Sequence, residues 1–145
     1  MAEFQKALIV NCSPEAAFQY LSDLTRHPEW AANKLDIQKT SDGPTVEGTT
    51  FHSAGHLMGK HEGEVRIIEL VPNEKIVYEA DDDTGRFRHS ILLAPADGGT
   101  MITKSAEVLE TRALTMKLAS PLLGLIVPRG LQQDLEKIKA RLEAS

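Results

Sequence analysis

The residues with the clearest chemical potential are a histidine and a glutamate in two neighbouring stretches of strand-like sequence. His89 lies in the first stretch and Glu107 in the second. A three-residue loop at 97–99 would set Glu107 opposite His89 on one face of the sheet. A carboxylate beside an imidazole can orient it as a general base that removes a proton next to a carbonyl group. The pair could instead satisfy only itself or orient a ligand.

The register of the last strand decides whether this pair forms. A two-residue loop would bury Lys104 opposite Ile91, and burying an unpaired ammonium is costly. We therefore expect the three-residue loop, which turns Ser105 and Glu107 inward and Lys104 outward.

Three further histidines, His52, His56 and His61, surround another predicted hairpin. With Gly59 and Lys60 as its loop, His52 and His56 share the inward face. Four residues of strand separate these two by about 13 Å, so they cannot chelate one ion together. His56 and His61 lie diagonally across the hairpin, but no third ligand is apparent. We therefore expect no metal site and no cofactor.

A third hairpin places a histidine and a phenol on an apolar face. With its loop at 84–85, Asp83 would oppose Arg86 and Asp81 would oppose Arg88 on the outer face. The inward face would then hold Ile76, Tyr78, Ala80, Phe87, His89, Ile91 and Leu93. The Tyr78 hydroxyl could reach a ligand carbonyl, or it could simply find a partner within the protein.

These hairpins belong to a series of short strands joined by turn residues. Strands are predicted near 3–11, 35–40, 48–57, 61–71, 75–82, 86–94 and 100–110. Such a series favours an antiparallel meander. Two short helices should follow the first strand, one capped by Ser13 with Pro14 in its first turn, the other beginning near His27 and Pro28.

The last predicted element is a long amphipathic helix. Its apolar stripe consists of Leu118, Leu122, Leu125, Leu131, Leu135, Ile138 and Leu142. Pro128 and Gly130 should kink or break the helix near its middle. Segment 119–130 is then either a portal flank that admits ligand or touches a membrane, or a surface packed on the short helices or on a second subunit.

The composition excludes several classes of protein. A length of 145 residues suits one domain, which we expect to span 1–145. The net charge of −5 and the scattered basic residues disfavour nucleic-acid binding. Cys12 is the only cysteine, and the longest apolar stretch is far shorter than the roughly 20 residues of a membrane span. Because no signal peptide is evident either, we expect a cytoplasmic protein.

A sheet with one apolar face can close that face by curling round the long helix. The inward residues are small or polar, and only 5% of the chain is aromatic, so we expect a cavity that they do not fill. The residues expected to line it are His52, His56, Val65, Ile67, Tyr78, Phe87, His89, Ile91, Ser105, Leu118, Leu122 and Leu125.

Several local motifs carry a resemblance to a known family. They are Ile9, Cys12-Ser13-Pro14-Glu15, Phe18, Leu21, Asp23, Arg26, Pro28, Glu29, Trp30 and Gly98-Gly99-Thr100. With these motifs the chain resembles the START-like (SRPBCC) superfamily, within it the polyketide cyclase/dehydrase and lipid transport proteins. Those proteins usually carry alanine where this chain has Cys12. The resemblance implies an α+β helix-grip fold, in which a curved antiparallel sheet of about seven strands wraps round a long C-terminal helix.

Three functional hypotheses follow. The first, which we favour, is a carrier that binds a small hydrophobic molecule, such as a lipid or polyketide, in the internal cavity. The second is a polyketide-cyclase-like lyase or isomerase that uses His89 and Glu107. The third is an interaction module whose apolar helix segment forms a homodimer.

Overall fold

A computed structural model describes residues 3–56, 60–112 and 114–144. One antiparallel sheet has the strand order β1-β7-β6-β5-β4-β3-β2. The strands are β1 (Glu3–Val10), β2 (Leu35–Lys39), β3 (Thr50–His56), β4 (Lys60–Val71), β5 (Lys75–Asp82), β6 (Gly85–Ala96) and β7 (Gly99–Thr111). The helices are α1 (Pro14–Leu21), η1 (Leu24–Glu29), α2 (Leu114–Ala119), η2 (Ser120–Leu122) and α3 (Leu123–Glu143).

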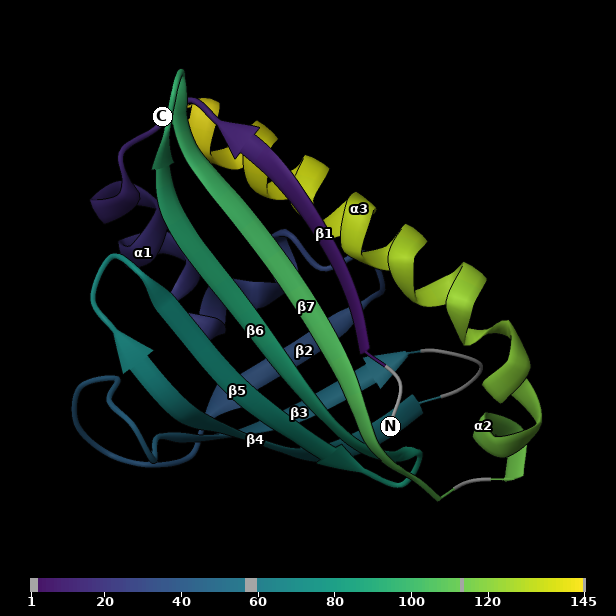
Figure 1. The fold of residues 1–145 in the computed structure, drawn as a ribbon. Helices are drawn as coiled ribbons and strands as arrows, with labels where there is room; N and C mark the ends of the chain where they lie inside the picture. The colour runs from purple at the N-terminus through teal and green to yellow at the C-terminus, as the bar shows by residue number, and fades with distance from the viewer. Residues whose placement is uncertain (1–2, 57–59, 113, 145) are drawn as a thin grey trace.

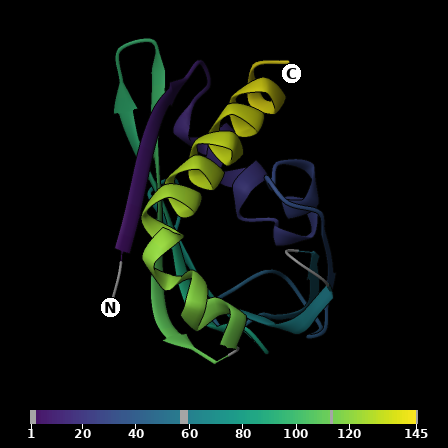
Figure 2. The same cartoon turned by 90° about the vertical axis from the view of Figure 1, so that its right-hand side faces the viewer.

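The predicted α+β helix-grip fold is confirmed. The sheet curves around α3, which lies along its concave side (Figures 1 and 2). Two register shifts, between Ile67 and Glu69 in β4 and between Arg86 and Phe87 in β6, interrupt the regular pairing. Such bulges bend a strand and increase its twist. They help the sheet to close over the helix.

The two short helices follow β1 as predicted, although the second begins earlier than expected. The Ser13 hydroxyl accepts a hydrogen bond from the backbone N–H of Ala16 at 3.1 Å and caps α1. Asp23, not His27, caps η1, and Pro28 lies inside this 3₁₀ helix. The shorter helix places Trp30 directly after its end, where the indole is completely buried.

The long C-terminal helix is interrupted at a different place from the one predicted. α3 continues through Pro128, and the irregular turn η2 precedes it. A proline inside a helix costs about 3 kcal/mol. Burial of each leucine or isoleucine returns about 1.5–3 kcal/mol, and several such residues follow Pro128. The residues of α3 that are buried in the core are Leu123, Leu131, Leu135, Ile138 and Leu142.

The first part of the predicted apolar stripe is wrong. Leu118, Leu122 and Leu125 are 71%, 53% and 64% exposed, so they do not continue the core-facing stripe of α3. The stripe instead begins at Leu123 and runs through Val127 to Leu131. This change of face follows from the spacing within α3: Leu123, Val127 and Leu131 recur every four residues and share one side of the helix, whereas Leu125 lies on another side.

The predicted register of the β3–β4 hairpin is also wrong. Lys60 already belongs to β4 and lies opposite His56, while the predicted loop residue Gly59 lies outside the described residues. His52 therefore opposes Glu64 and is exposed, whereas Phe51 opposes Val65 and is buried. The alternative would leave the phenyl ring of Phe51 in water, at a cost of about 1.5–3 kcal/mol.

The β5–β6 hairpin keeps the predicted inward face despite a shift of register. Asp82 pairs with Gly85, so Asp81 opposes Arg86 instead of Arg88. A shift of two residues leaves every side chain on its original face. The inward positions of Tyr78 and His89 are thus confirmed, and these two residues lie opposite one another.

The preferred register of the last hairpin is wrong, and the rejected one is present. Ala96 pairs with Gly99 across a two-residue turn, which places Lys104 opposite Ile91 on the inward face. The backbone φ of Gly98 is +87°, a conformation that glycine adopts readily. Glu107 opposes Arg88 on the outer face and is an ion-pair partner of it at 3.8 Å. The predicted pair of His89 and Glu107 therefore does not form.

Candidate functional site, a buried polar centre

A lysine of the sheet lies in the interior of the molecule. Lys104 is 1% exposed, and its Nζ lies 3.0 Å from Oδ2 of Asp134 on α3. The same ammonium lies 4.8 Å from the centre of the Trp30 ring. An ion pair and a cation–π contact thus compensate for the lost hydration of the charge. This is why the register that buries Lys104 is stable, contrary to the expectation.

Asp134 joins three parts of the chain. Besides binding Lys104 of β7, its Oδ1 accepts a hydrogen bond from the backbone N–H of Ala32 at 2.6 Å. Ala32 follows η1, and one turn further along α3 the Lys137 ammonium binds the carbonyl of Ala31 at 2.9 Å. These contacts hold α3 against the segment that carries Trp30.

Four rings form a continuous row beside this ion pair. Trp30 and His27 stack with ring centres 4.0 Å apart, and His27 meets Tyr78 edge-on at 5.9 Å. Tyr78 in turn stacks on His89 at 5.1 Å. We call this row, together with Lys104 and Asp134, the polar centre.

Three polar atoms of the polar centre are buried without a partner. They are Nε1 of Trp30, the hydroxyl of Tyr78 and Nδ1 of His89, and none has a hydrogen-bond partner among the described residues. A buried polar group left in this way costs about 1–3 kcal/mol, and native proteins contain few of them. This row of rings contains three such atoms, and a molecule bound there could form hydrogen bonds with them.

The polar centre has no net charge at neutral pH. Burial, and then the nearby Lys104 ammonium, lower the pKa of His89 to about 3. The same two causes, followed by His89, hold the pKa of His27 well below its ordinary value. Burial, and then the Asp134 carboxylate, raise the pKa of Tyr78. Both imidazoles and the phenol are therefore neutral, and Lys104 and Asp134 balance one another.

The predicted lining residues fall into different regions. Tyr78 and His89 belong to the polar centre, and Val65, Ile67 and Ile91 are buried in the main apolar core. Phe87 packs in a second cluster near the start of α3 with Phe4, Val108, Leu123 and Val127. The remaining predicted residues lie away from the centre, namely His52, His56, Ser105, Leu118, Leu122 and Leu125.

Other interactions account for several of the displaced residues. His52 lies 3.3 Å from Glu62 and half of its side chain is exposed, while His56 lies 4.0 Å from Asp36. The Ser105 hydroxyl lies 3.4 Å from the Gln5 side chain of β1. Within the described ranges, no three His, Cys, Asp or Glu residues are grouped closely enough to hold a metal ion.

Sequence reasoning missed four members of the polar centre: His27, Trp30, Lys104 and Asp134. Two signals were present. Lys104 interrupts the inward positions of an otherwise apolar strand, and Asp134 adjoins the buried Leu135 in the core-facing part of the last helix. Opposite charges at two such positions indicate a buried pair, because either alone would be costly.

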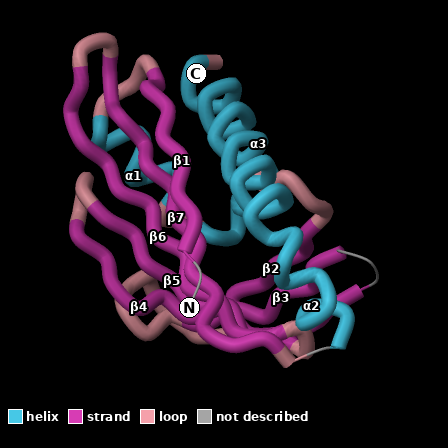
Figure 3. Tube along the Cα trace, turned by 45° about the vertical axis from the view of Figure 1, so that its right-hand side comes forward, coloured by secondary structure: helices cyan, strands magenta, loops and turns pink. Residues whose placement is uncertain are grey.

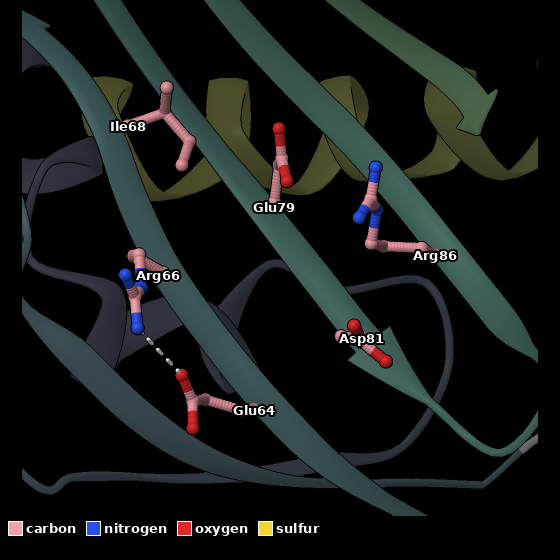
Figure 4. A pocket seen from close by; sticks show the side chains of 6 residues that line it. All are labelled: Glu64, Arg66, Ile68, Glu79, Asp81 and Arg86. Carbon is pink, nitrogen blue, oxygen red and sulfur yellow. Dashed lines mark hydrogen bonds and ion pairs between the residues drawn. The ribbon is translucent and has the colours of Figure 1, made fainter. Parts of the chain in front are cut away.

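Two open surface depressions lie outside the polar centre. One is on the outer face of the sheet and is lined by Glu64, Arg66, Ile68, Glu79, Asp81 and Arg86 (Figure 4). Glu64 and Arg66 pair with each other there, while Glu79 pairs with Arg88 and Asp81 with Arg112. The second lies near β2 and β3 beside Pro28 and His52. In the described part of the chain, none of the residues that line either depression carries a buried unpartnered polar atom.

Comparisons with known proteins agree with the fold. The family described as polyketide cyclase/dehydrase and lipid transport matches residues 1–143. The solved structure of the Zhui aromatase/cyclase from Streptomyces is similar, with a TM-score of 0.80 and 15% identity over 98% of this chain and 93% of that one. The structure of a Thermus thermophilus protein has a TM-score of 0.79 and 15% identity over 99% of this chain and 98% of that one. The structure of a Chromobacterium violaceum protein has a TM-score of 0.72 and 21% identity over 99% of both chains.

These identities are low, so the structural likenesses show the shared fold alone. No curated protein matches the sequence. Among the described helices, none is both long enough and apolar enough to cross a membrane.

Proposed function

Because this chain belongs to the polyketide cyclase/dehydrase and lipid transport family, we propose that it binds a small hydrophobic molecule between the sheet and α3. The observation that carries the proposal is the set of three buried, unpartnered polar atoms in the polar centre. They adjoin apolar core residues such as Ile67, Ile91 and Leu135. A ligand with an apolar body and one polar end would bury the first against this core and satisfy the second.

Binding without chemical change is favoured over catalysis. The Streptomyces relative is named an aromatase/cyclase, and a cyclase or dehydratase needs a group that takes up a proton at working pH. His89 has a pKa near 3, which makes it a weak base, and Glu107 lies on the other face of the sheet. A carrier needs only the binding surface.

A bulkier side chain at the polar centre should weaken binding. Ala106 lies opposite His89 on the inward face, so Ala106→Phe would place a ring beside the imidazole. Titration with the uncharged dye Nile red should show an affinity at least about tenfold lower in this variant. Trp30 is the only tryptophan, so its fluorescence reports occupancy independently.

Ala94→Phe is the matched control, because Ala94 lies in the same strand pair but is exposed. Its affinity should stay within about twofold of the parent. Native mass spectrometry of protein purified from its own host provides a second readout. The proposal would be contradicted if both variants had the same affinity for Nile red, or if the parent protein did not bind the dye.

A second candidate function concerns an exposed apolar surface on α2, η2 and the start of α3. We call Leu114, Leu118, Leu122, Leu125 and Ile126 the leucine surface; they are 48–71% exposed. Figure 3 shows this part of the chain at the end of the molecule opposite the C-terminus. Between residues 113 and 133 the only charged residues are Lys117 and Arg129, although the whole chain carries −5.

We infer that the leucine surface binds an anionic phospholipid bilayer. Apolar side chains flanked by basic ones are typical of surfaces that lie on membranes. Two copies of the same basic surface would repel each other, which disfavours a homodimer through this face. Contact with a membrane would also suit a protein that exchanges an apolar molecule.

Replacing Leu118 and Leu125 with serine should reduce binding to vesicles of phosphatidylcholine and phosphatidylglycerol by about tenfold. Co-sedimentation with the vesicles measures this. Leu92→Ser is the control, because Leu92 is 40% exposed but lies on the outer face of β6. The membrane assignment would be contradicted if the parent protein did not bind the vesicles but formed a dimer through these leucines.

A further inference from the structure

We propose that the polar centre binds an uncharged hydrogen-bond acceptor, a carbonyl oxygen, at the polar end of the ligand. This assignment rests on the proposed function and adds the chemical class of the group that is recognised. It would make Trp30 and Tyr78 the residues that select the ligand.

The first argument comes from the available protons. The indole Nε1 of Trp30 carries a hydrogen and can only donate. The Tyr78 hydroxyl keeps its proton, because burial raises its pKa, and it is likewise free to donate. A carbonyl oxygen has two lone pairs and no hydrogen of its own, so it can accept from either donor.

The second argument comes from charge. The Lys104 ammonium is already paired with Asp134 at 3.0 Å, and the neighbouring histidines are neutral. A carboxylate brought into the centre would therefore be buried without a counter-ion, which is costly. An amine cation would meet the Lys104 ammonium and the hydrogen atoms of two donors. Neutral ligands should thus be preferred to fatty acids and to amines.

The third argument concerns His89. Its neutral imidazole either donates or accepts at Nδ1, according to the tautomer. Its stacking on Tyr78, with ring centres 5.1 Å apart, places it beside the phenol that would donate to the ligand. The imidazole can therefore adjust to a second polar atom on the ligand without adding a charge.

Four compounds of equal chain length test the assignment: decane, methyl octyl ketone, decanoate and decylamine. Isothermal titration calorimetry should give the ketone about tenfold higher affinity than decane, from one or two hydrogen bonds made in a dry site. Decanoate and decylamine should both bind more weakly than the ketone. In Tyr78→Phe the advantage of the ketone over decane should fall to about threefold or less, while the affinity for decane stays unchanged.

The chain offers a matched control, because its one other tyrosine, Tyr20, donates its hydroxyl to Glu29 at 3.0 Å outside the polar centre. Tyr20→Phe should keep the full preference for the ketone. Tyr78→Phe removes a hydroxyl without a partner, so the ligand-free variant should melt at or above the temperature of the parent.

The possible failures are distinguishable. If decane and the ketone bind equally well, or if decanoate binds best, an apolar site exists and the carbonyl assignment is overturned. If none of the four compounds binds, the proposed hydrophobic binding fails and the carbonyl assignment fails with it. A ketone preference that survives Tyr78→Phe would remove Tyr78 from the site.

Discussion

Replacing Asp134 with asparagine should lower the free energy of unfolding by about 3–5 kcal/mol. The substitution leaves the Lys104 ammonium, 1% exposed, without a counter-ion in the interior. Asparagine keeps a side-chain oxygen for the N–H of Ala32, so the loss measures the charge and not the other hydrogen bond. Domains are stable by only about 5–15 kcal/mol, which makes this effect large. Urea unfolding at neutral pH measures it.

Removing both charges should restore most of the stability. Lys104→Met combined with Asp134→Asn leaves no buried charge, and such replacements are often neutral or stabilising. Glu69→Gln is the surface control: Glu69 pairs with Lys75 at 2.9 Å, but both side chains are about 40% exposed. It should cost less than about 1 kcal/mol. A loss that small in Asp134→Asn would show that the buried pair does not hold α3 to the sheet.

Mild acid should destabilise the protein through His27 and His89. Both imidazoles are neutral in the folded state because burial lowers their pKa, to about 3 for His89. The unfolded chain takes up protons near the ordinary pKa of 6.5, so it binds more protons than the native state below that pH. The contribution of these two histidines to the free energy of unfolding is therefore fully present above pH 6.5. It is lost as the pH falls toward their pKa in the folded state. The slope reaches about 1.4 kcal/mol per pH unit for each histidine.

Unfolding free energies between about pH 6.5 and pH 5 isolate this effect, because most carboxylates titrate lower. His89→Phe and His27→Phe keep a ring in the row, and each should reduce the slope by up to about 1.4 kcal/mol per pH unit. The double variant should be nearly independent of pH in this window. A parent protein whose stability is flat between these limits would show that the histidines are charged when folded.

Much of the fold could be predicted because its signals are local. Ser13 and Pro14 specify the start of α1 without reference to distant residues. The turn residues between strands likewise fix the number and order of the strands. The inward faces of β4, β5 and β6 were predicted correctly from the alternation of apolar and polar residues, despite the two register shifts. In β3, the assumed loop at Gly59 and Lys60 placed His52 and His56 on the inward face, whereas burial of Phe51 decides the register.

The polar centre could not be predicted because its key contact is distant in sequence. Whether Lys104 may be buried depends on Asp134, which lies on a helix thirty residues later. If the cost of burying Lys104 is considered without Asp134, the three-residue loop is preferred. That wrong loop places Glu107 on the inward face. Tyr78 and His89 were correctly predicted to face inward, because the pattern within β5 and β6 themselves decides which side of the sheet they occupy. His27 and Trp30 were missed because η1 carries no periodic pattern.

The pairing of β1 with β7 has a consequence for the order of folding. Val10 pairs with Thr100 and Glu3 with Glu107, so the first strand finds its neighbour only after nearly all the others exist. Contacts between such distant segments form slowly, because a long loop must close first. During synthesis β1 leaves the ribosome before β2 to β6, and it has no β7 to pair with while they emerge. The backbone N–H and C=O groups of β1 that pair with β7 therefore remain unpaired until β7 has been synthesised.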